Sequence, residues 1–181
     1  MEQAALSPTA SAFRAFSRDK LVGQYWPRLQ ACAGSLTSEQ LWWRPNESSN
    51  SVGNLLLHLN GNVMQWLVAP FTGLEDTRNR PAEFNARDGA DVATLLASLA
   101  ATIEKASQVL DRLTEAELSA HYEIQGYHVT GLHAVYQVVE HFGLHYGQIA
   151  YIAKMLQGRD LGFYRELTAT GRMSGGTQTT P

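Results

Sequence analysis

The chain has 181 residues and a mass of 20.0 kDa, so we expect one domain of ordinary size. Hydrophobic residues make up 44% of it, charged residues make up 17%, and the net charge is −3. This slight acidic excess argues against a nucleic-acid-binding protein, which normally carries a basic excess on one face. The single cysteine, Cys32, excludes an internal disulfide framework. Because no signal peptide is visible either, we expect a cytoplasmic protein.

Four long helical patterns occupy the middle of the chain. We expect residues 1–11 and 169–181 to be disordered and residues 12–168 to form the folded domain. The apolar spacing predicts helices over residues 11–33, 51–68, 91–113 and 130–156. Pro27 must be accommodated within the first helix or kink it, and Pro70 is expected to stop the second.

Two short connectors carry the same signature. Thr37 with Gln40, and Thr114 with Glu117, have the spacing of capping boxes, and each pair follows a long helical pattern. No run of residues has the alternation that is typical of strands. We therefore predict an all-α protein, a four-helix bundle with short capped connector helices.

The segment between Glu47 and Glu75 contains no charged residue, so it must be tested as a membrane span. A spanning helix needs about 20 predominantly apolar residues. Asparagine and histidine side chains interrupt this segment, and four polar side chains fall within residues 54–62. We expect a buried wall of the bundle instead, with a subunit contact on its back, and no membrane partner.

His141 and His145 are the most informative pair of residues. Residues four apart share a helix face, so two imidazoles at this spacing can chelate one metal ion. No charged residue occurs from His141 to Ala153, which predicts a largely buried helix. Buried imidazoles need partners, and a shared ion supplies one to both. Gly143 and Gly147 are expected to leave room for a neighbouring helix.

His58 is the natural third ligand because it lies in the middle of the other charge-free helix. A single histidine there is more often a satisfied core residue, but the His141–His145 pair favours a ligand. His133 is eight residues before His141, about 12 Å away along a helix, and is better placed at a pocket mouth. His121 and His128 fall in a connector and are expected to be solvated.

Three neutral imidazoles leave a divalent ion with an open position, the pattern of catalytic rather than structural zinc sites. Zinc is the default, but Ni, Fe and Mn also accept imidazole. Candidates to hold the ligands in place are Gln148, three residues after His145, and Asn62, one turn after His58. Glu140 adjoins His141 but is rotated from it, so a solvated role is favoured over the pocket edge. No residue stands out as a general base.

Several motifs together resemble one superfamily. Residues 50–58, NSVGNLLLH, followed far downstream by residues 141–148, HFGLHYGQ, resemble the DinB/YfiT-like superfamily of metalloenzymes. Residues 41–46, LWWRPN, and residues 160–164, DLGFY, are similar to an uncharacterised bacterial branch of it. The resemblance extends over residues 12–166. The tryptophans of the LWWRPN motif usually close a core, and the alternative is that they wall a substrate pocket.

The resemblance implies an up-down-down-up four-helix bundle, frequently a homodimer, with a divalent metal between helices. It places the metal ligands of the superfamily at His58, His141 and His145. Relatives include metal-dependent transferases that use low-molecular-weight thiols such as bacillithiol or mycothiol, and maleylpyruvate isomerases that use mycothiol. Others are described as metal-dependent hydrolases. The DinB name refers to DNA damage and does not imply DNA binding.

Three functions remain open at this point. In the first, the protein is a small-thiol-dependent S-transferase, in which the ion lowers the pKa of a thiol that attacks a small electrophile. This accounts for the absence of a marked protein nucleophile, since nothing distinguishes Cys32 as reactive. In the second, the protein is a metal-dependent hydrolase, which needs a base. In the third, it is a non-catalytic metal-binding dimeric bundle.

Overall fold

The structure is a computed structural model that describes residues 6–171, with the side chains of residues 166 and 167 left out. It is mostly helical and includes a small two-stranded sheet. The first two long helical segments are composite, and each contains a π-helical stretch, labelled η. The first is α1 (Pro8–Arg18), η1 (Asp19–Tyr25) and α2 (Trp26–Ala33); the second is α4 (Val52–Val63), η2 (Met64–Val68) and α5 (Ala69–Thr72). The other two are α7 (Val92–Arg112) and α9 (Gly131–Gln157).

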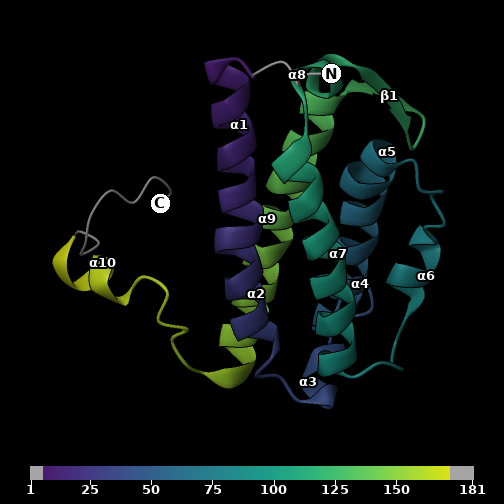
Figure 1. The fold of residues 1–181 in the computed structure, drawn as a ribbon. Coiled ribbons are helices and arrows are strands. Elements are labelled where there is room, and N and C mark those ends of the chain that lie inside the picture. The colour runs from purple at the N-terminus through teal and green to yellow at the C-terminus, as the bar shows by residue number, and fades with distance from the viewer. Residues whose placement is uncertain (1–5, 172–181) are drawn as a thin grey trace.

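The four long segments lie side by side in Figure 1. In this view, the α1–α2 segment and α9 run downward, whereas the α4–α5 segment and α7 run upward. Helix α4 packs against both α7 and α9, and the first segment contacts α7 through α1 and α9 through α2. Apolar side chains from all four segments fill the space between them, among them Leu29, Leu56, Leu99 and Phe142, which are fully buried. Burial of these side chains is the main force that holds the segments together.

Each composite helix passes a proline by way of its π-helical stretch. Pro27 lies in the first turn of α2, directly after η1, and Pro70 lies in the first turn of α5, directly after η2. Proline lacks an N–H and clashes with the carbonyl one turn back, so a wider turn before it relieves both problems. The prediction that Pro70 stops the helix is therefore wrong. The helix ends at Thr72, where Gly73 adopts a left-handed conformation with φ of 72°.

Three of the long helices begin where the sequence predicts, and side chains cap them. Ser51 caps α4 and forms a capping box with Asn54, while Asp91 caps α7 and Thr130 caps α9. The predicted connectors are the short helices α3 (Ser38–Trp42) and α8 (Glu115–Ser119), and both have the full capping box. Side-chain oxygens thus satisfy backbone N–H groups at each of these helix starts.

A β-hairpin, which the sequence analysis did not predict, separates α8 from α9. Strands β1 (His121–Ile124) and β2 (Tyr127–Thr130) pair antiparallel through a two-residue loop. Both loop residues have positive φ, 53° at Gln125 and 78° at Gly126, as a type I′ turn requires. Glutamine is an unusual residue there, and the strands have only four residues each, so the sequence signal is weak. His121 and His128 are exposed in this hairpin, as expected.

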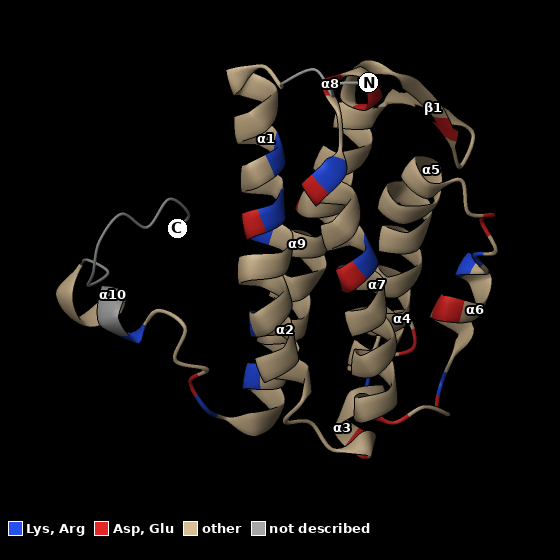
Figure 2. Cartoon of the chain, in the orientation of Figure 1, with Lys and Arg blue, Asp and Glu red and all other residues tan. Residues whose placement is uncertain are grey.

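The connection between α5 and α7 contains another unpredicted element, α6 (Arg80–Asn85). It packs on the outer side of α4 (Figure 1). Every residue from Ser51 to Phe71 is consequently buried or partly buried. Figure 2 shows that the charged residues lie mainly on α1, α6, α7 and the loops. The charge-free character of α4 thus reflects coverage by the same chain.

The ends of the described chain extend the helical structure. Residues 8–11, which we expected to be disordered, form the first turn of α1, because Ser7 caps this helix and Pro8 suits its first position. Helix α10 (Arg165–Thr170) likewise continues past the expected boundary at residue 168 and lies outside the bundle (Figure 1). Residues 1–5 and 172–181 lie outside the described residues. Within the described part, no helix combines the length and apolar character needed to cross a membrane.

Candidate metal centre

Helix α9 carries His141 and His145 on consecutive turns of one face. Both side chains are partly buried, and their ring centroids are 4.4 Å apart. Gly143 lies between them, and a Cβ atom at this position would approach the Tyr25 ring to 3.0 Å. The glycine therefore allows the first helical segment to pack closely, as predicted. Gly147 has open space around it instead, so that part of the prediction is wrong.

Helix α4 presents His58 to this pair. His58 is only 4% exposed, and its ring centroid is 5.0 Å from those of His141 and His145. The Nε2 atoms of His58 and His141 are 2.8 Å apart, and one ring nitrogen from each of the three histidines lies within 4.8 Å of the others. Three histidines separated by as many as 87 residues thus come together, as the sequence predicted. Nitrogen ligands of a tetrahedral zinc ion lie about 3.4 Å apart, so small side-chain rotations suffice for a fit.

A buried ion pair holds the other side of the His58 ring. Nδ1 of His58 is 2.9 Å from Oε2 of Glu83, whose side chain is 9% exposed. Arg78 donates to both oxygens of the same carboxylate, from Nε at 2.7 Å and from Nη2 at 2.8 Å. Glu83 belongs to α6 and Arg78 to the preceding connection. A carboxylate behind a metal-binding histidine fixes the ring orientation and raises its basicity.

The hydrogen-bonding pattern determines which nitrogen of His58 carries the proton. Burial raises the pKa of Glu83, but the hydrogen bonds with Arg78 and His58 outweigh it, so the pKa lies below its ordinary value. An ionised carboxylate only accepts, so His58 must donate from Nδ1. Nη2 of Arg78 also lies 3.0 Å from that nitrogen, but this is a close approach, because both groups are donors. The lone pair of His58 is therefore on Nε2, which faces His141.

Gly61 makes room for this ion pair. It lies one turn after His58 on α4, and a Cβ atom there would overlap Oε1 of Glu83 and come within 2.7 Å of Nε of Arg78. Any larger residue would displace the carboxylate from the histidine. Gly61 lies within a helix and has ordinary helical dihedral angles, so its small size, and not its conformational freedom, is what the ion pair requires.

Asn54 fixes α6 to the start of α4. Its side-chain nitrogen donates to the carbonyls of Glu83, at 2.7 Å, and Ala86, at 2.9 Å. Its side-chain oxygen accepts from Arg44 at 2.6 Å and from the backbone N–H of Ser51 at 3.1 Å. The capping residue of the histidine-bearing helix therefore also anchors the helix that supplies the carboxylate.

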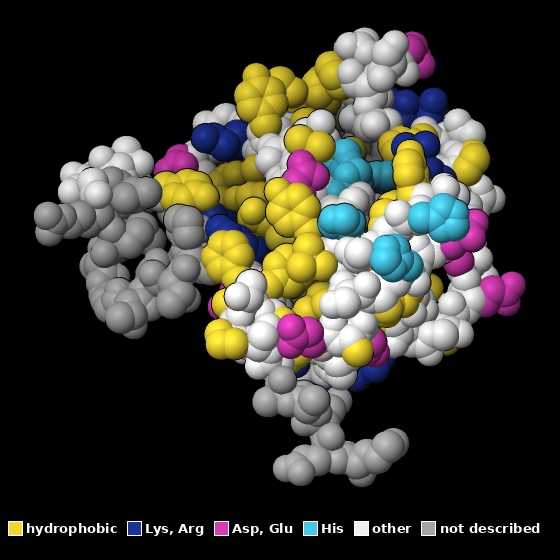
Figure 3. Space-filling view, turned by 90° about the horizontal axis from the view of Figure 1, so that it is seen from above, with side chains coloured by type: hydrophobic (Ala, Val, Ile, Leu, Met, Phe, Trp, Pro, Cys, Tyr) yellow, Lys and Arg dark blue, Asp and Glu magenta, His cyan; other side chains and the backbone are white. Residues whose placement is uncertain are grey.

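The predicted supporting residues have different positions. Oε1 of Gln148 lies 2.7 Å from Nδ1 of His145, so this histidine donates from Nδ1 and keeps its lone pair on Nε2. Asn62 is 4% exposed, but its Oδ1 has no hydrogen-bond partner among the described residues. Glu140 is exposed, as the favoured solvated role predicts. His133 is exposed as well, and Figure 3 shows histidine side chains on the face seen from above.

A second buried oxygen without a hydrogen-bond partner lies at about the same height in the bundle as Oδ1 of Asn62. Oε1 of Gln137 is buried and has no hydrogen-bond partner in the described structure. Gln137 is one turn before His141 on α9, and Asn62 is one turn after His58 on α4. Because these two helices run in opposite directions (Figure 1), both steps lead toward the same end of the bundle. Two amide acceptors are therefore placed one turn from the three histidines.

The histidines of α9 are held in the neutral form that metal binding requires. Burial, followed by the neighbouring His145 and His58, lowers the pKa of His141 to about 4. Arg78 and Arg80 lower this pKa further. Burial also lowers the pKa of His145 below its ordinary value, against the opposing effect of the Gln148 hydrogen bond. Imidazole binds a metal through an unprotonated nitrogen, so little competition from protons remains at neutral pH.

No sequence pattern pointed to four residues in or beside this site: Glu83, Arg78, Gly61 and Gln137. One local signal for α6 exists, since Asn79 caps it and Pro81 lies in its first turn. That signal predicts a helix start, but it does not indicate which side chain reaches His58.

Comparison with known proteins identifies the family and the fold. Residues 17–168 match the family model described as "Protein of unknown function (DUF1572)". The chain belongs to the DUF1572 family. This family has a DinB-like fold. A search of curated proteins gives no match.

Among solved structures, the chain is similar to one titled "Crystal structure of the conserved protein of locus from Enterococcus faecalis". The TM-score is 0.67 and the sequence identity is 20%, with 86% of this chain and 100% of that chain covered. At this identity, the similarity concerns the fold alone.

Proposed function

We propose that this DUF1572 protein is a metal-dependent enzyme, a small-thiol-dependent S-transferase that acts on a small electrophile. The observation that carries the proposal is the cluster of His58, His141 and His145, with one ring nitrogen of each within 4.8 Å of the others. We further propose that the helical segments form the up-down-down-up bundle of DinB-like proteins. In that arrangement, α4 and α9 supply the ligands from opposite sides of the site.

The three histidines suit a divalent ion, with zinc as the default and Ni, Fe or Mn as alternatives. His58, His141 and His145 would hold such an ion through neutral imidazoles, and the ion would lower the pKa of a bound thiol or water. The chain itself determines the tautomers of two of these histidines. Glu83 accepts from Nδ1 of His58 and Gln148 accepts from Nδ1 of His145, so both rings keep the lone pair on Nε2.

The protein itself offers no thiol for the reaction. Cys32 is fully buried in α2, and burial raises the pKa of its thiol to about 11. A protonated buried thiol is a poor nucleophile. The sulfur nucleophile of a transferase must therefore come from a second small molecule.

The surroundings of the histidines bear on the choice between a thiol and a hydrolytic water. Both oxygens of Glu83 are occupied by hydrogen bonds with Arg78 and His58, so this carboxylate is not free to act as a general base. The unpaired oxygens of Asn62 and Gln137, one turn from the histidines, would accept hydrogen bonds from N–H or O–H groups of a thiol ligand. Buried acceptors of this kind otherwise cost stability.

Exposed apolar side chains on α9 support the proposed homodimer. Leu132 and Leu144 are 42% and 54% exposed along this helix. Helix α4 was expected to share the contact, but its outer side is covered by α6. Sedimentation of the wild type beside Leu144→Asp tests this proposal: a dimer that the variant splits supports it, and a monomeric wild type overturns it.

Thioether formation is the direct test of the transferase. Chelated protein is reloaded with Zn, Ni, Fe or Mn in parallel and mixed with small thiols and an activated aromatic chloride. In the expected reaction, a C–S bond forms, the C–Cl bond breaks, chloride leaves, and the thiol proton passes to solvent. Mass spectrometry detects the thioether, and His145→Ala with an unchanged circular dichroism spectrum is the control.

The same preparations discriminate the alternatives. Metal-dependent thioether formation that His145→Ala abolishes supports the proposal. Hydrolysis of a para-nitrophenyl ester without any thiol would instead support the metal-dependent hydrolase. Metal binding without either reaction would favour the non-catalytic bundle and contradict the transferase.

A further inference from the structure

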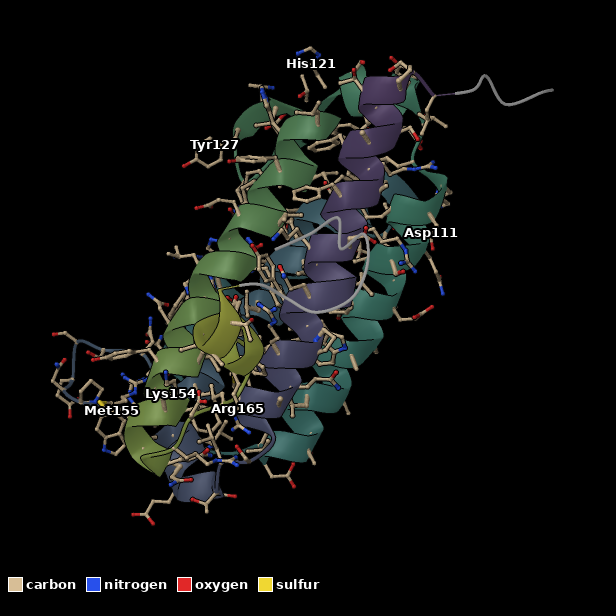
Figure 4. The ribbon with its side chains drawn as sticks, turned by 90° about the vertical axis from the view of Figure 1, so that its left-hand side faces the viewer. Asp111, His121, Tyr127, Lys154, Met155 and Arg165 are labelled. Carbon is tan, nitrogen blue, oxygen red and sulfur yellow. The ribbon has the colours of Figure 1, made fainter. Side chains whose placement is uncertain are left out.

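A cavity of about 460 Å³ lies between α9 and the connection from α3 to α4. Its size is within the range of small-molecule sites. None of the described residues that line it is charged. Six of them are apolar or aromatic: Trp43, Pro45, Leu55, Tyr151, Ile152 and Met155. Figure 4 shows Met155 near the lower end of α9, on the side where the connection passes.

The cavity begins one helical turn from the three histidines. Leu55 precedes His58 by three residues on α4, and Gln148 follows His145 by three residues on α9. Because the two helices run in opposite directions, both steps lead to the same end of the bundle (Figure 1). Gln148 connects the two regions physically, since it lines the cavity while its Oε1 accepts from Nδ1 of His145 at 2.7 Å.

We propose that this cavity binds the uncharged, aromatic part of the electrophile on which the histidine site acts. This inference rests on the proposed function, and it adds the class of substrate. Trp43 and Tyr151 supply aromatic surfaces for a planar group, and aromatic pairs are favourable beyond the area that they bury. Gln148 and Ser48 provide polar groups at the edge for hydrogen bonds that orient the ligand.

The uncharged lining disfavours an ionic ligand in this cavity. An ionised group there would exchange part of its water for side chains that carry no opposite charge, which is unfavourable. Cationic side chains lie instead on the α6 side of the site, where Arg78 bonds Glu83 and Arg80 stacks on Phe84, which packs against His58. The two sides of the histidine cluster thus differ in charge, and the uncharged side suits a neutral molecule.

Helix α9 carries two exposed tyrosines, of which one lines the cavity and the other serves as a matched control. Tyr151, which lines the cavity, is 71% exposed, and Tyr136, which does not, is 61% exposed on the same helix. Both side chains are removable without disturbing the core. Only the loss of Tyr151 should affect a ligand in the cavity.

The test uses chelated, metal-free protein, so that it is independent of the metal site. Para-nitrobenzyl alcohol, a neutral aromatic, and para-nitrobenzoate, its anionic counterpart, are titrated against tryptophan fluorescence, which a nearby nitro group quenches. The alcohol should bind at least about ten times more tightly than the anion, given the cost of an unpaired charge. Tyr151→Ala should weaken binding of the alcohol by roughly 3- to 10-fold, and Tyr136→Ala by less than about 2-fold.

Besides an absence of alcohol binding, three results would overturn the inference. They are equal effects of the two tyrosine variants, binding of the anion as tight as that of the alcohol, and loss of binding as protein concentration rises, which would mean that a second copy of the chain covers the cavity. If metal binds but the alcohol does not, the inference fails while the proposed metal site stands. If the alcohol binds as expected but no metal does, the cavity stands and the proposed enzyme fails.

Discussion

The two sides of the histidine cluster are built differently. On the α4 side, His58 is 4% exposed and is fixed by the buried Glu83–Arg78 pair, which comes from two other segments. On the α9 side, His141 and His145 come from one helix and are only partly buried. Besides the short contact between His141 and His58, the described residues give this pair one hydrogen-bond partner, Gln148, which is itself exposed. In the proposed metal site, one ligand would thus be held in place before an ion binds, and the other two would have freedom to rotate toward it.

This difference explains how a cluster with nitrogen separations of up to 4.8 Å can close around an ion. A preorganised ligand reduces the entropy lost on binding, whereas the partly exposed ligands adjust the distances. Of the two adjustable histidines, His145 is connected to the uncharged cavity through Gln148.

The largest expected effect comes from breaking the rigid side. Glu83→Ala leaves Arg78 buried without its partner, which should cost roughly 3–5 kcal/mol of unfolding free energy. Urea unfolding of metal-free protein measures this. Glu75→Ala, at an exposed position in the same connection, should change stability by less than about 0.5 kcal/mol. Equal losses in the two variants would show that the ion pair does not stabilise this region.

The second largest effect is on zinc affinity, which should fall more when the α4 side is changed than when the α9 side is changed. Glu83→Gln removes the negative charge behind His58 and should weaken zinc binding by about 10- to 100-fold. Gln148→Ala should weaken it less, by under about 10-fold, because water can replace an exposed amide. Competition with a chromophoric chelator gives both values. The reverse order would contradict the assignment of His58 as the fixed ligand.

A pair of glycine substitutions sharpens the comparison further. Gly61→Ala pushes Glu83 and Arg78 away from His58 and should destabilise the protein by about 1–3 kcal/mol while lowering zinc affinity. Gly147→Ala adds a methyl group in open space within a helix and should stabilise by up to about 1 kcal/mol. Thermal unfolding and zinc titration of both variants check this. If Gly61→Ala also stabilises, the close approach at Gly61 is not needed.

The last effect, which is negligible at neutral pH and grows in acid, is a dependence of stability on pH. The pKa of His141 is lowered to about 4 in the folded metal-free protein, below the ordinary value of about 6.5 expected when unfolded. The unfolded chain therefore binds more protons between these values, so stability is lost as pH falls from about 6.5 to about 4. Urea unfolding at several pH values should show a shallower loss for His141→Ala than for the exposed control His133→Ala. Identical slopes would mean that His141 is not buried in its neutral form.

Sequence patterns predicted the α9 side better than the α4 side, for a physical reason. The spacing of His141 and His145 follows from helix periodicity, a local property. Apolar spacing is a local property as well, and three of the ranges that it predicted begin at Ser51, Asp91 and Thr130, which cap α4, α7 and α9. The contact between Glu83 and His58 depends instead on how a six-residue helix folds back over α4, which no periodicity encodes.

Two other features differ from the sequence prediction, because a residue there adopts a conformation that its type does not favour. A π-helical stretch carries the second helix past Pro70, although proline usually ends a helix. Gln125 takes a positive φ that glutamine seldom adopts, so the hairpin turn was not recognised. In both places, the surrounding structure overrides the preference of one residue.

Metal content is the most direct test of the three-histidine site. Wild type, His58→Ala and His145→Ala are purified, incubated with Zn, Ni, Fe or Mn, desalted and measured by plasma mass spectrometry. A three-histidine site predicts about one ion per chain in the wild type and loss of that ion in both variants. A wild type without metal after every incubation, or full metal content in both variants, would contradict it.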